Sequence, residues 1–239
     1  MASEHSDPLV LYGYWRSSSA YRVRIALNLK GLDYEQRPVH LVRDGGAQNL
    51  PAYREINPLG LVPALQHGRQ VVVQSLAICE YLEDLFPVPA LLPEDVSGRA
   101  RVRGLAQSIA SEIQPLNNLG VQQYLKREMR QPEEAIHAWL AHWVARGFSA
   151  LETWLENSAT GRFCHGDQPG LADCFLVPQV YNAERFSSDL EPYPNIRRIS
   201  TLCQELPAFS GQSRLEGKKP QRMHSHRQGI WYAPAGAGR

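Results

Sequence analysis

Three consecutive serines, Ser17, Ser18 and Ser19, lie where a predicted strand ends and a predicted helix begins. The start of a helix has four backbone N–H groups without partners and a partial positive charge, so it stabilises anions. A thiolate suits such a place, because a helix start with hydroxyl donors lowers a thiol pKa from about 8.5 in water towards neutrality. The stretch holds no cysteine, so the thiol would arrive with a ligand. The alternative is that the serines only cap the helix.

Two further stretches favour the ligand interpretation of the serines. Val62-Pro63 precedes a predicted hairpin and favours a cis bond, with the backbone of Val62 free to pair with a peptide-like ligand. Gln74-Ser75 ends a strand and opens a helix, and this second helix start suits a ligand carboxylate.

The elements that position these residues alternate in the first part of the chain. Leu9–Trp15 is apolar and rich in Tyr, which predicts a strand, and Ala20–Leu29 has an apolar helical face that ends at Gly31. The other elements expected here are a strand at 33–41, a short helix or loop at 47–57, a hairpin at 62–75 turning at His67-Gly68, and a helix at 75–86 with Ser75 as its N-cap. The order β-α-β-α-β-β-α predicts a small mixed sheet with helices on its faces.

The second part of the chain lacks the strand pattern. Pro87–Pro93 holds three prolines in seven residues and is typical of a linker. Beyond it, helices are predicted at Arg99–Arg127, Pro132–Glu156, Leu171–Phe186 and Ile196–Glu205. The chain is therefore predicted to divide into an α/β domain at 7–90, an all-α domain at 95–209, and an atypical, basic and flexible tail at 210–239.

Composition limits the classes of function. The 239 residues are 43% hydrophobic and 21% charged, as in soluble globular proteins, and no run reaches the ~20 apolar residues that span a bilayer. The N-terminus lacks the basic end and apolar stretch of a signal peptide. Six Lys/Arg and one Glu lie at 210–239, which leaves 19 bases and 23 acids in the body and gives no sign of a nucleic-acid partner.

The cysteines are widely separated and no His/Cys cluster has metal-ligand spacing. Free, buried thiols in a reducing cytosol are therefore expected, as is a cytoplasmic protein that binds neither metal nor membrane. The four positions are Cys79, Cys164, Cys174 and Cys203.

Four motifs resemble the zeta class of glutathione transferases: "RSSSAYRVRIALNLKG", "QSLAICEYLE", "IQPLNNL" and "LVPQVYNAERF". They occur in the family's order, and the resemblance extends from Leu9 to Phe209. It implies the glutathione transferase architecture, an α/β thioredoxin-like N-terminal domain followed by an all-α C-terminal domain. It also implies glutathione as cofactor and a homodimer.

The resemblance implies roles for the two helix starts and for two arginines. Ser17 and Ser18 would contact the glutathione sulfur, with Ser18 as the main stabiliser of the thiolate. Arg185 would hold a substrate carboxylate and Arg16 could be a second such cation; a base without a role in the site is the alternative for each. The residues implied to bind glutathione are Ser17, Ser18, Ser19, Gln48, Val62, Gln74, Ser75, Gln114, Asn118, Leu119 and Gly120.

Two positions depart from the family pattern. Ser19 replaces the family's cysteine, so redox chemistry with an enzyme thiol is not expected here, whereas isomerase activity should survive. Gly170 stands where Ser or Thr usually forms a capping box with Asp173, at a cost of roughly a few tenths of a kcal/mol.

Arg22 and Arg24 leave their helix on different sides and are expected to be structural or interfacial.

The activity implied is the glutathione-dependent cis–trans isomerisation of maleylacetoacetate, a small diacid, to fumarylacetoacetate in tyrosine and phenylalanine breakdown. Maleylpyruvate, from gentisate breakdown, is the nearest rival substrate. Relatives that use it carry Arg shortly after the Asn pair, where this chain has Leu119-Gly120. The same thiolate could instead serve glutathione conjugation or dehalogenation of α-halo acids. A non-catalytic glutathione-binding scaffold is the hypothesis without an enzymatic activity.

Overall fold

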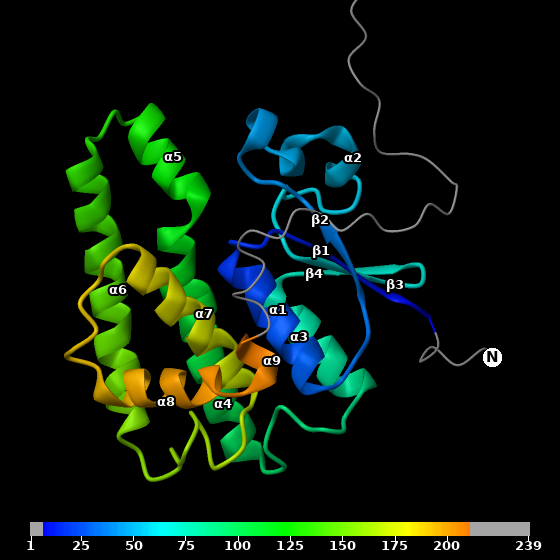
Figure 1. The fold of residues 1–239 in the computed structure, drawn as a ribbon, viewed down its shortest axis with the longest axis vertical. Coiled ribbons are helices and arrows are strands. Elements are labelled where there is room, and N and C mark those ends of the chain that lie inside the picture. Colours follow the sequence, from blue (N-terminus) through cyan, green and yellow to red (C-terminus); the bar gives the residue numbers. More distant parts are fainter. Residues whose placement is uncertain (1–6, 211–239) are drawn as a thin grey trace, which may run out of the picture.

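A computed structural model describes residues 7–210 of the chain (Figure 1). A four-stranded sheet with its helices forms an α/β part, on the right of Figure 1, and a helical part lies on the left. This order matches the predicted succession of an α/β and an all-α domain. The boundaries at 7–90 and 95–209 stay predictions, and the predicted flexible tail lies outside the described residues from 211 onward.

The sheet has the strand order β2-β1-β3-β4, built from β1 (Leu9–Gly13), β2 (Glu35–Pro38), β3 (Ala64–His67) and β4 (Gln70–Val73). Strand β1 is parallel to β2 and antiparallel to β3, and this inner position fits a sequence that is buried at every residue. Strands β3 and β4 form the predicted hairpin. Its turn comes one residue later than predicted, because His67 still pairs with Gln70 and Gly68 takes a φ of +57°.

Two helices of the α/β part carry the predicted anion sites. Helix α1 (Ser18–Leu29) begins at the serines and ends before Gly31, whose φ of +65° is that of the predicted C′ glycine. Helix α3 (Ser75–Leu85) has Gln74 as its N-cap, so the prediction of Ser75 as N-cap is wrong by one residue. The short elements between β2 and β3 are η2 (Arg43–Gly45), η3 (Ala47–Asn49) and α2 (Pro51–Arg54).

The helical part contains α4 (Val96–Ser108), α5 (Leu119–Arg127), α6 (Glu133–Leu155), α7 (Leu171–Arg185), α8 (Pro194–Gln204) and α9 (Pro207–Ser210). The predicted single helix over Arg99–Arg127 is wrong. After α4 come a π-helical turn, η4 (Ile109–Ile113), and a 3-10 turn, η5 (Gln114–Asn117). Pro115 has no N–H to continue the α-helical ladder, and Asn118 starts a new helix by accepting the N–H of Gly120 at 2.7 Å.

One hydrophobic core joins the two parts. Helix α1 packs against both α3 and α7, and the core includes Ile25 and Leu65 from the α/β part together with Phe148 and Phe175 from the helical part. The four cysteines are buried and unpaired, as predicted. A shared core fixes the two parts relative to each other more firmly than a polar interface would.

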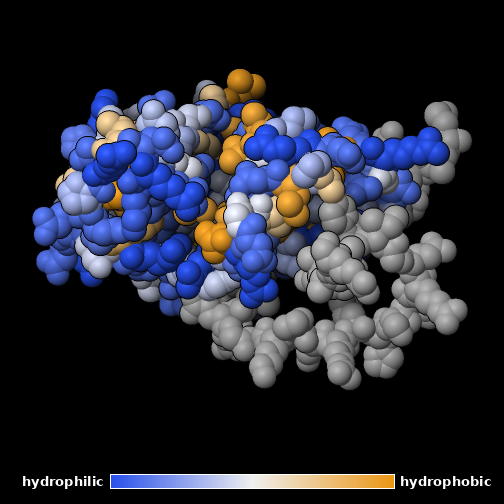
Figure 2. Space-filling view, turned by 90° about the horizontal axis from the view of Figure 1, so that it is seen from above, coloured by the Kyte–Doolittle hydropathy of each residue, from blue (hydrophilic) through white to orange (hydrophobic). Residues whose placement is uncertain are grey.

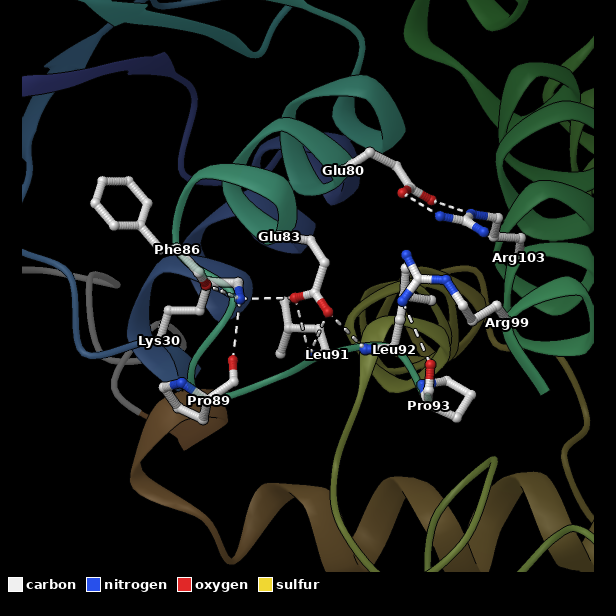
Figure 3. A network of polar contacts seen from close by, with 10 residues as sticks. All are labelled: Lys30, Glu80, Glu83, Phe86, Pro89, Leu91, Leu92, Pro93, Arg99 and Arg103. Atoms are coloured by element: carbon white, nitrogen blue, oxygen red, sulfur yellow. Dashed lines mark hydrogen bonds and ion pairs between the residues drawn. The ribbon is translucent and has the colours of Figure 1, made fainter. Parts of the chain in front are cut away.

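A buried ion pair fastens the linker between the parts (Figure 3). Lys30 Nζ lies 2.7 Å from Glu83 Oε2 and also donates to the carbonyls of Phe86 (2.6 Å) and Pro89 (3.0 Å). Glu83 in turn accepts the N–H of Leu91 at 2.9 Å. Nearby, Arg103 of α4 forms a more exposed, two-pronged pair with Glu80 of α3.

The start of α7 explains why glycine is tolerated at position 170. Asp173 Oδ2 accepts the N–H of Gly170 at 2.8 Å, so the carboxylate half of the capping box is kept. The carbonyl of Leu91 accepts the N–H of Leu171 at 2.8 Å and approaches Gly170 closely. A Cβ at position 170 would lie 2.8 Å from that oxygen, so Ser or Thr would force the linker to shift.

Candidate functional site

A cleft of about 480 Å³ lies between the α/β part and the helical part. The starts of α1 and α3 and the segment before β3 form one wall; η5, the start of α5 and the end of α7 form the other. Every predicted site residue lines this cleft: Arg16, Ser17, Ser18, Ser19, Gln48, Val62, Gln74, Ser75, Gln114, Asn118, Leu119, Gly120 and Arg185. The structure therefore brings all of them together, while their individual roles stay predictions.

The charge of the cleft is entirely positive. Arg16 and Arg185 line it, and no Asp, Glu, Lys, His or Cys within residues 7–210 does so. Both arginines are exposed, and neither forms an ion pair in the described part of the chain. The guanidinium carbon of Arg16 lies 4.4 Å from the ring centroid of Trp15. Two planar guanidinium groups can each bind a carboxylate through two hydrogen bonds, so the cleft suits a dianion.

The rim of the cleft on the α/β side is apolar. Val42, Leu59 and Leu61 line the cleft and are among the exposed large hydrophobic residues. Seen from above, hydrophobic residues gather near the middle of the molecule, beside the more hydrophilic surface on the left (Figure 2). An apolar rim can cover the non-polar carbons of a bound ligand and strengthen the electrostatic interactions below it.

The serines divide between capping and the cleft. Ser17 is the N-cap of α1, and its Oγ accepts the N–H of Ala20 at 3.2 Å. Ser18 is the first residue of the helix and is buried, but it lines the cleft, and its hydroxyl forms no hydrogen bond within residues 7–210. Capping thus accounts for Ser17, while the hydroxyl of Ser18 remains available to an anion at the helix start.

The loop that carries the serines is held from behind by Arg24. Its Nη2 donates to the carbonyl of Trp15 at 3.2 Å and its Nη1 to that of Tyr14 at 3.4 Å. The N–H of Ser17 donates to the same Tyr14 carbonyl at 3.0 Å. Arg24 is buried, and burial lowers its pKa from the usual value. These hydrogen bonds give Arg24 a structural role, which is one of the two roles predicted for it; the interfacial alternative stays a prediction.

The segment before β3 offers backbone groups to the cleft. The Val62-Pro63 bond is cis, as predicted, and Val62 forms no backbone hydrogen bond within residues 7–210. Close to it, Gln48 donates from Nε2 to the carbonyl of Leu41 at 3.1 Å, while its buried Oε1 has no partner in the same residues. These groups can pair with the amides of a peptide-like ligand.

The start of α3 forms a second place for an anion. Gln74 takes a φ of +72°, and no side chain from residues 7–210 caps the helix. The hydroxyl of Ser75 accepts a hydrogen bond from Nη1 of Arg22 at 3.1 Å. The first N–H groups of α3 therefore remain available for a ligand carboxylate.

Sequence reasoning missed a group of buried amides on the helical wall. Asn117 and Asn182 line the cleft, and Gln179 Nε2 lies between them, 3.4 Å from Asn117 Oδ1 and 3.5 Å from Asn182 Oδ1. Two signals pointed to them. Asn117 is the other half of the Asn pair, and Asn182 precedes Arg185 by three residues, which places both on one face of α7. Two aromatic residues of the cleft were also missed: Tyr14, two residues before Arg16, and Phe186, which directly follows Arg185.

Residues 7–210 lack two features that would indicate other classes of protein. No helix there has the length and apolar character needed to cross a membrane. No group of three or more His, Cys, Asp or Glu side chains in that range could hold a metal ion.

Known proteins resemble the chain over most of its length. Residues 11–91 match the family model of the glutathione S-transferase N-terminal domain, and residues 138–200 match that of the C-terminal domain. The chain is 50% identical over 200 residues to the maleylacetoacetate isomerase of Pseudomonas aeruginosa. The matched residues cover 83% of this chain and 92% of that enzyme.

Solved structures give the same likeness. A holo structure of maleyl pyruvate isomerase, a bacterial glutathione S-transferase of the zeta class, is 48% identical, with a TM-score of 0.82 over 85% of this chain and 95% of that one. The maleylacetoacetate isomerase of Anaeromyxobacter dehalogenans with bound GSH is also 48% identical, with a TM-score of 0.76 over 87% of this chain and 95% of that one.

Proposed function

Since the chain belongs to the zeta class of the glutathione S-transferase family, we propose that it converts maleylacetoacetate to fumarylacetoacetate with glutathione as cofactor. The predicted family and glutathione transferase architecture are confirmed. One observation supports the proposed reaction above all. The cleft combines the available hydroxyl of Ser18 at a helix start with two arginines and no acidic side chain among the described residues.

The residues of the cleft fit glutathione, a tripeptide with one thiol and two carboxylates. The start of α1 with Ser18 suits the sulfur, the backbone of Val62 suits a peptide amide, and the start of α3 suits a carboxylate. The unpartnered Oε1 of Gln48 can accept an N–H of the same ligand. Glutathione, when bound, supplies a thiolate that adds reversibly to the alkene, so that the former double bond can rotate before the thiolate leaves.

The chain's own residues would prepare and orient this reaction. Ser18 donates its hydroxyl, together with the N–H groups at the start of α1, and keeps the sulfur ionised. Arg185 and Arg16 bind the carboxylates of the diacid and place its double bond near the sulfur. The same positive charge stabilises the enolate oxygen that develops in the substrate when the carbon–sulfur bond forms.

The test is turnover of purified protein on maleylacetoacetate with and without glutathione. We expect isomerisation that depends on glutathione. Maleylpyruvate is the competing substrate, because a structure of a maleylpyruvate isomerase is 48% identical over nearly its whole length. Gly120 brings no side chain to the cleft, where relatives that use maleylpyruvate carry an arginine nearby, so we expect maleylacetoacetate to be turned over faster.

Different outcomes of the same assay would identify a different function. Turnover only of α-halo acids would favour dehalogenation. Glutathione binding by calorimetry without turnover of any of these substrates would favour a scaffold. The absence of glutathione binding would overturn the proposed function.

We also propose that the protein acts as a homodimer in the cytoplasm, where tyrosine and phenylalanine breakdown would supply its substrate. Exposed Leu50, Leu59 and Leu61 give the α/β part an apolar surface that a second copy could cover. Light scattering that finds a monomer at micromolar concentration would contradict the dimer, and cell fractionation tests the location.

A further inference from the structure

We propose that Arg22 is a positioning residue for the ligand carboxylate that binds at the start of α3. Arg22 belongs to α1, but its side chain reaches α3, where Nη1 donates to the hydroxyl oxygen of Ser75 at 3.1 Å. Ser75 lines the cleft, whereas Arg22 lies behind it. This inference rests on the proposed function, because the carboxylate in question is one of the two of glutathione.

The burial of Arg22 is the first observation behind the inference. Arg22 is only 1% exposed, yet its Nε and Nη2 have no hydrogen-bond partner, and it forms no ion pair, within residues 7–210. Its guanidinium carbon lies 4.6 Å from the ring centroid of Phe175 on α7. Burial lowers its pKa to about 10, so it stays charged at neutral pH. A buried charge without a counter-charge is unfavourable for folding, so this arginine calls for an explanation other than stability.

The hydrogen bond to Ser75 supplies the second observation. Because the oxygen of Ser75 accepts from Arg22, its own proton is free to be donated elsewhere. Ser75 lies in the wall of the cleft at the start of α3, whose first N–H groups no side chain in the described part of the chain caps. A carboxylate there would receive the Ser75 hydroxyl, the N–H groups and the field of a buried cation directly behind them. It would also be the counter-charge for Arg22.

A comparison with Arg24 shows that the contact between Arg22 and α3 is not shared by the other buried arginine of α1. Both arginines come from α1 and both are buried, but Arg24 donates to the backbone carbonyls of Tyr14 and Trp15. Arg24 therefore supports the loop at the start of α1, and Arg22 supports the start of α3. The two helix starts of the cleft each have an arginine behind them.

Arg22→Met tests the inference, since methionine fills a buried site without charge. For wild type and variant, glutathione affinity is measured by calorimetry and turnover at saturating glutathione by kinetics. We expect Arg22→Met to weaken glutathione binding about 10- to 100-fold, as for loss of a charge-assisted contact. Turnover at saturation should stay within about threefold, because the variant leaves the sulfur site intact. Arg22→Lys keeps the charge and should retain part of the affinity.

Truncated ligands separate positioning from a merely structural role. One analogue, γ-aminobutyryl-cysteinylglycine, lacks the glutamyl carboxylate, and a second has the glycine carboxylate amidated. For the analogue that lacks the carboxylate seated on α3, wild type and Arg22→Met should bind equally. An equal loss for glutathione and for both analogues would overturn the inference. The same comparison with Arg22→Lys carries the test if the methionine variant does not fold.

Two controls complete the experiment. Arg101→Met removes a partly buried arginine that does not line the cleft and that donates to the backbone carbonyls of Cys164 and Trp154, and it should leave glutathione affinity unchanged. Thermal unfolding without ligand should show Arg22→Met at least as stable as wild type. If wild type and Arg22→Met bind glutathione with equal affinity, this inference alone is overturned. If wild type does not bind glutathione, the proposed function is overturned.

Discussion

Lys30 and Arg22, towards opposite ends of α1, are both buried cations, but their surroundings differ completely. Lys30 has a side chain that is 0% exposed; its charge is neutralised by Glu83, and it also donates hydrogen bonds to two carbonyls of the linker. Arg22 is as deeply buried, but its one hydrogen bond within residues 7–210 is to a serine of the cleft. The charge of Lys30 is therefore balanced inside the chain. The charge of Arg22 has no counter-charge within residues 7–210, and its one hydrogen bond leads to the ligand site.

The different surroundings of Lys30 and Arg22 indicate different roles: the cation at the end of α1 contributes to stability, and the cation near its start contributes to ligand binding. A buried ion pair whose remaining donors and acceptors are satisfied holds the two parts of the fold together. Within residues 7–210, buried side-chain polar atoms without partners are concentrated instead around the cleft, where Arg22, Gln48, Asn117 and Gln179 provide five of them. Removing a charge at the linker should therefore affect unfolding, and removing polar groups at the cleft should affect binding or turnover.

Glu83→Ala is the variant that should break the linker end most severely. It leaves Lys30 charged in the core and leaves the N–H of Leu91 unpaired, so the free energy of unfolding should fall by about 3–5 kcal/mol. Denaturant unfolding measures the loss. Glu80→Ala is the matched control, since Glu80 and Arg103 are 24% and 40% exposed and their pair should contribute about 1 kcal/mol or less. Equal losses for the two variants would contradict the importance of burial here.

Ser18→Ala should have the largest effect at the cleft end. Removing the hydroxyl that we propose to stabilise the glutathione thiolate should lower kcat about 10²- to 10³-fold, while glutathione affinity changes little. Ser17→Ala is the control within the same run, because the Ser17 hydroxyl caps the helix and its loss should lower the free energy of unfolding by about 1 kcal/mol. Steady-state kinetics beside thermal unfolding measure both. If Ser17→Ala lost turnover and Ser18→Ala lost stability, the two roles would be reversed.

Arg185→Ala should weaken binding of the acid substrate alone, and so separate substrate binding from glutathione binding within the cleft. Loss of a guanidinium bound to a carboxylate should raise KM for the diacid about 10- to 100-fold, with glutathione affinity unchanged. Arg185→Lys should recover part of the loss, because it keeps the charge but not the planar fork. A change in glutathione affinity as large as that in KM would place Arg185 at the cofactor instead.

Treatment of the native protein with a thiol reagent should have no effect on activity. Burial raises the pKa of Cys79 to about 12 and that of Cys174 well above its usual value, and none of the four thiols lines the cleft. A thiol reagent at pH 8 should therefore leave native protein unmodified and fully active, and should label four thiols once the chain is unfolded. Loss of activity on labelling of the native chain would show that a core thiol reaches the site.

Much of this arrangement could be predicted from local sequence, because helix starts and X-Pro bonds have short-range signals. The serine run, Val62-Pro63 and Gln74-Ser75 were found in that way, and the family resemblance added Gln114, Asn118 and Arg185. The break after α4 was missed, because the helical pattern masked the effect of Pro115 and the capping by Asn118. That break is what places Gln114 and Asn117 in the cleft.

The role of Arg22 depends on contacts that local sequence does not contain. Its spacing from Arg24 predicts different directions but not burial, which requires Ser75 of α3 and Phe175 of α7 to close around it. Gly170 is similar, because the reason for glycine there is a carbonyl of the linker rather than a neighbour in the helix. Long-range packing of this kind is visible only in the folded chain.

The Tyr14 carbonyl, which receives both Arg24 and the N–H of Ser17, has a thermodynamic consequence. Fixing one residue's backbone costs about 1–2 kcal/mol of conformational entropy, and here that cost is met when the chain folds. If the glutathione sulfur binds at the start of α1, as we propose, it binds to a loop that is already ordered, and little of the binding free energy has to offset the ordering of that loop.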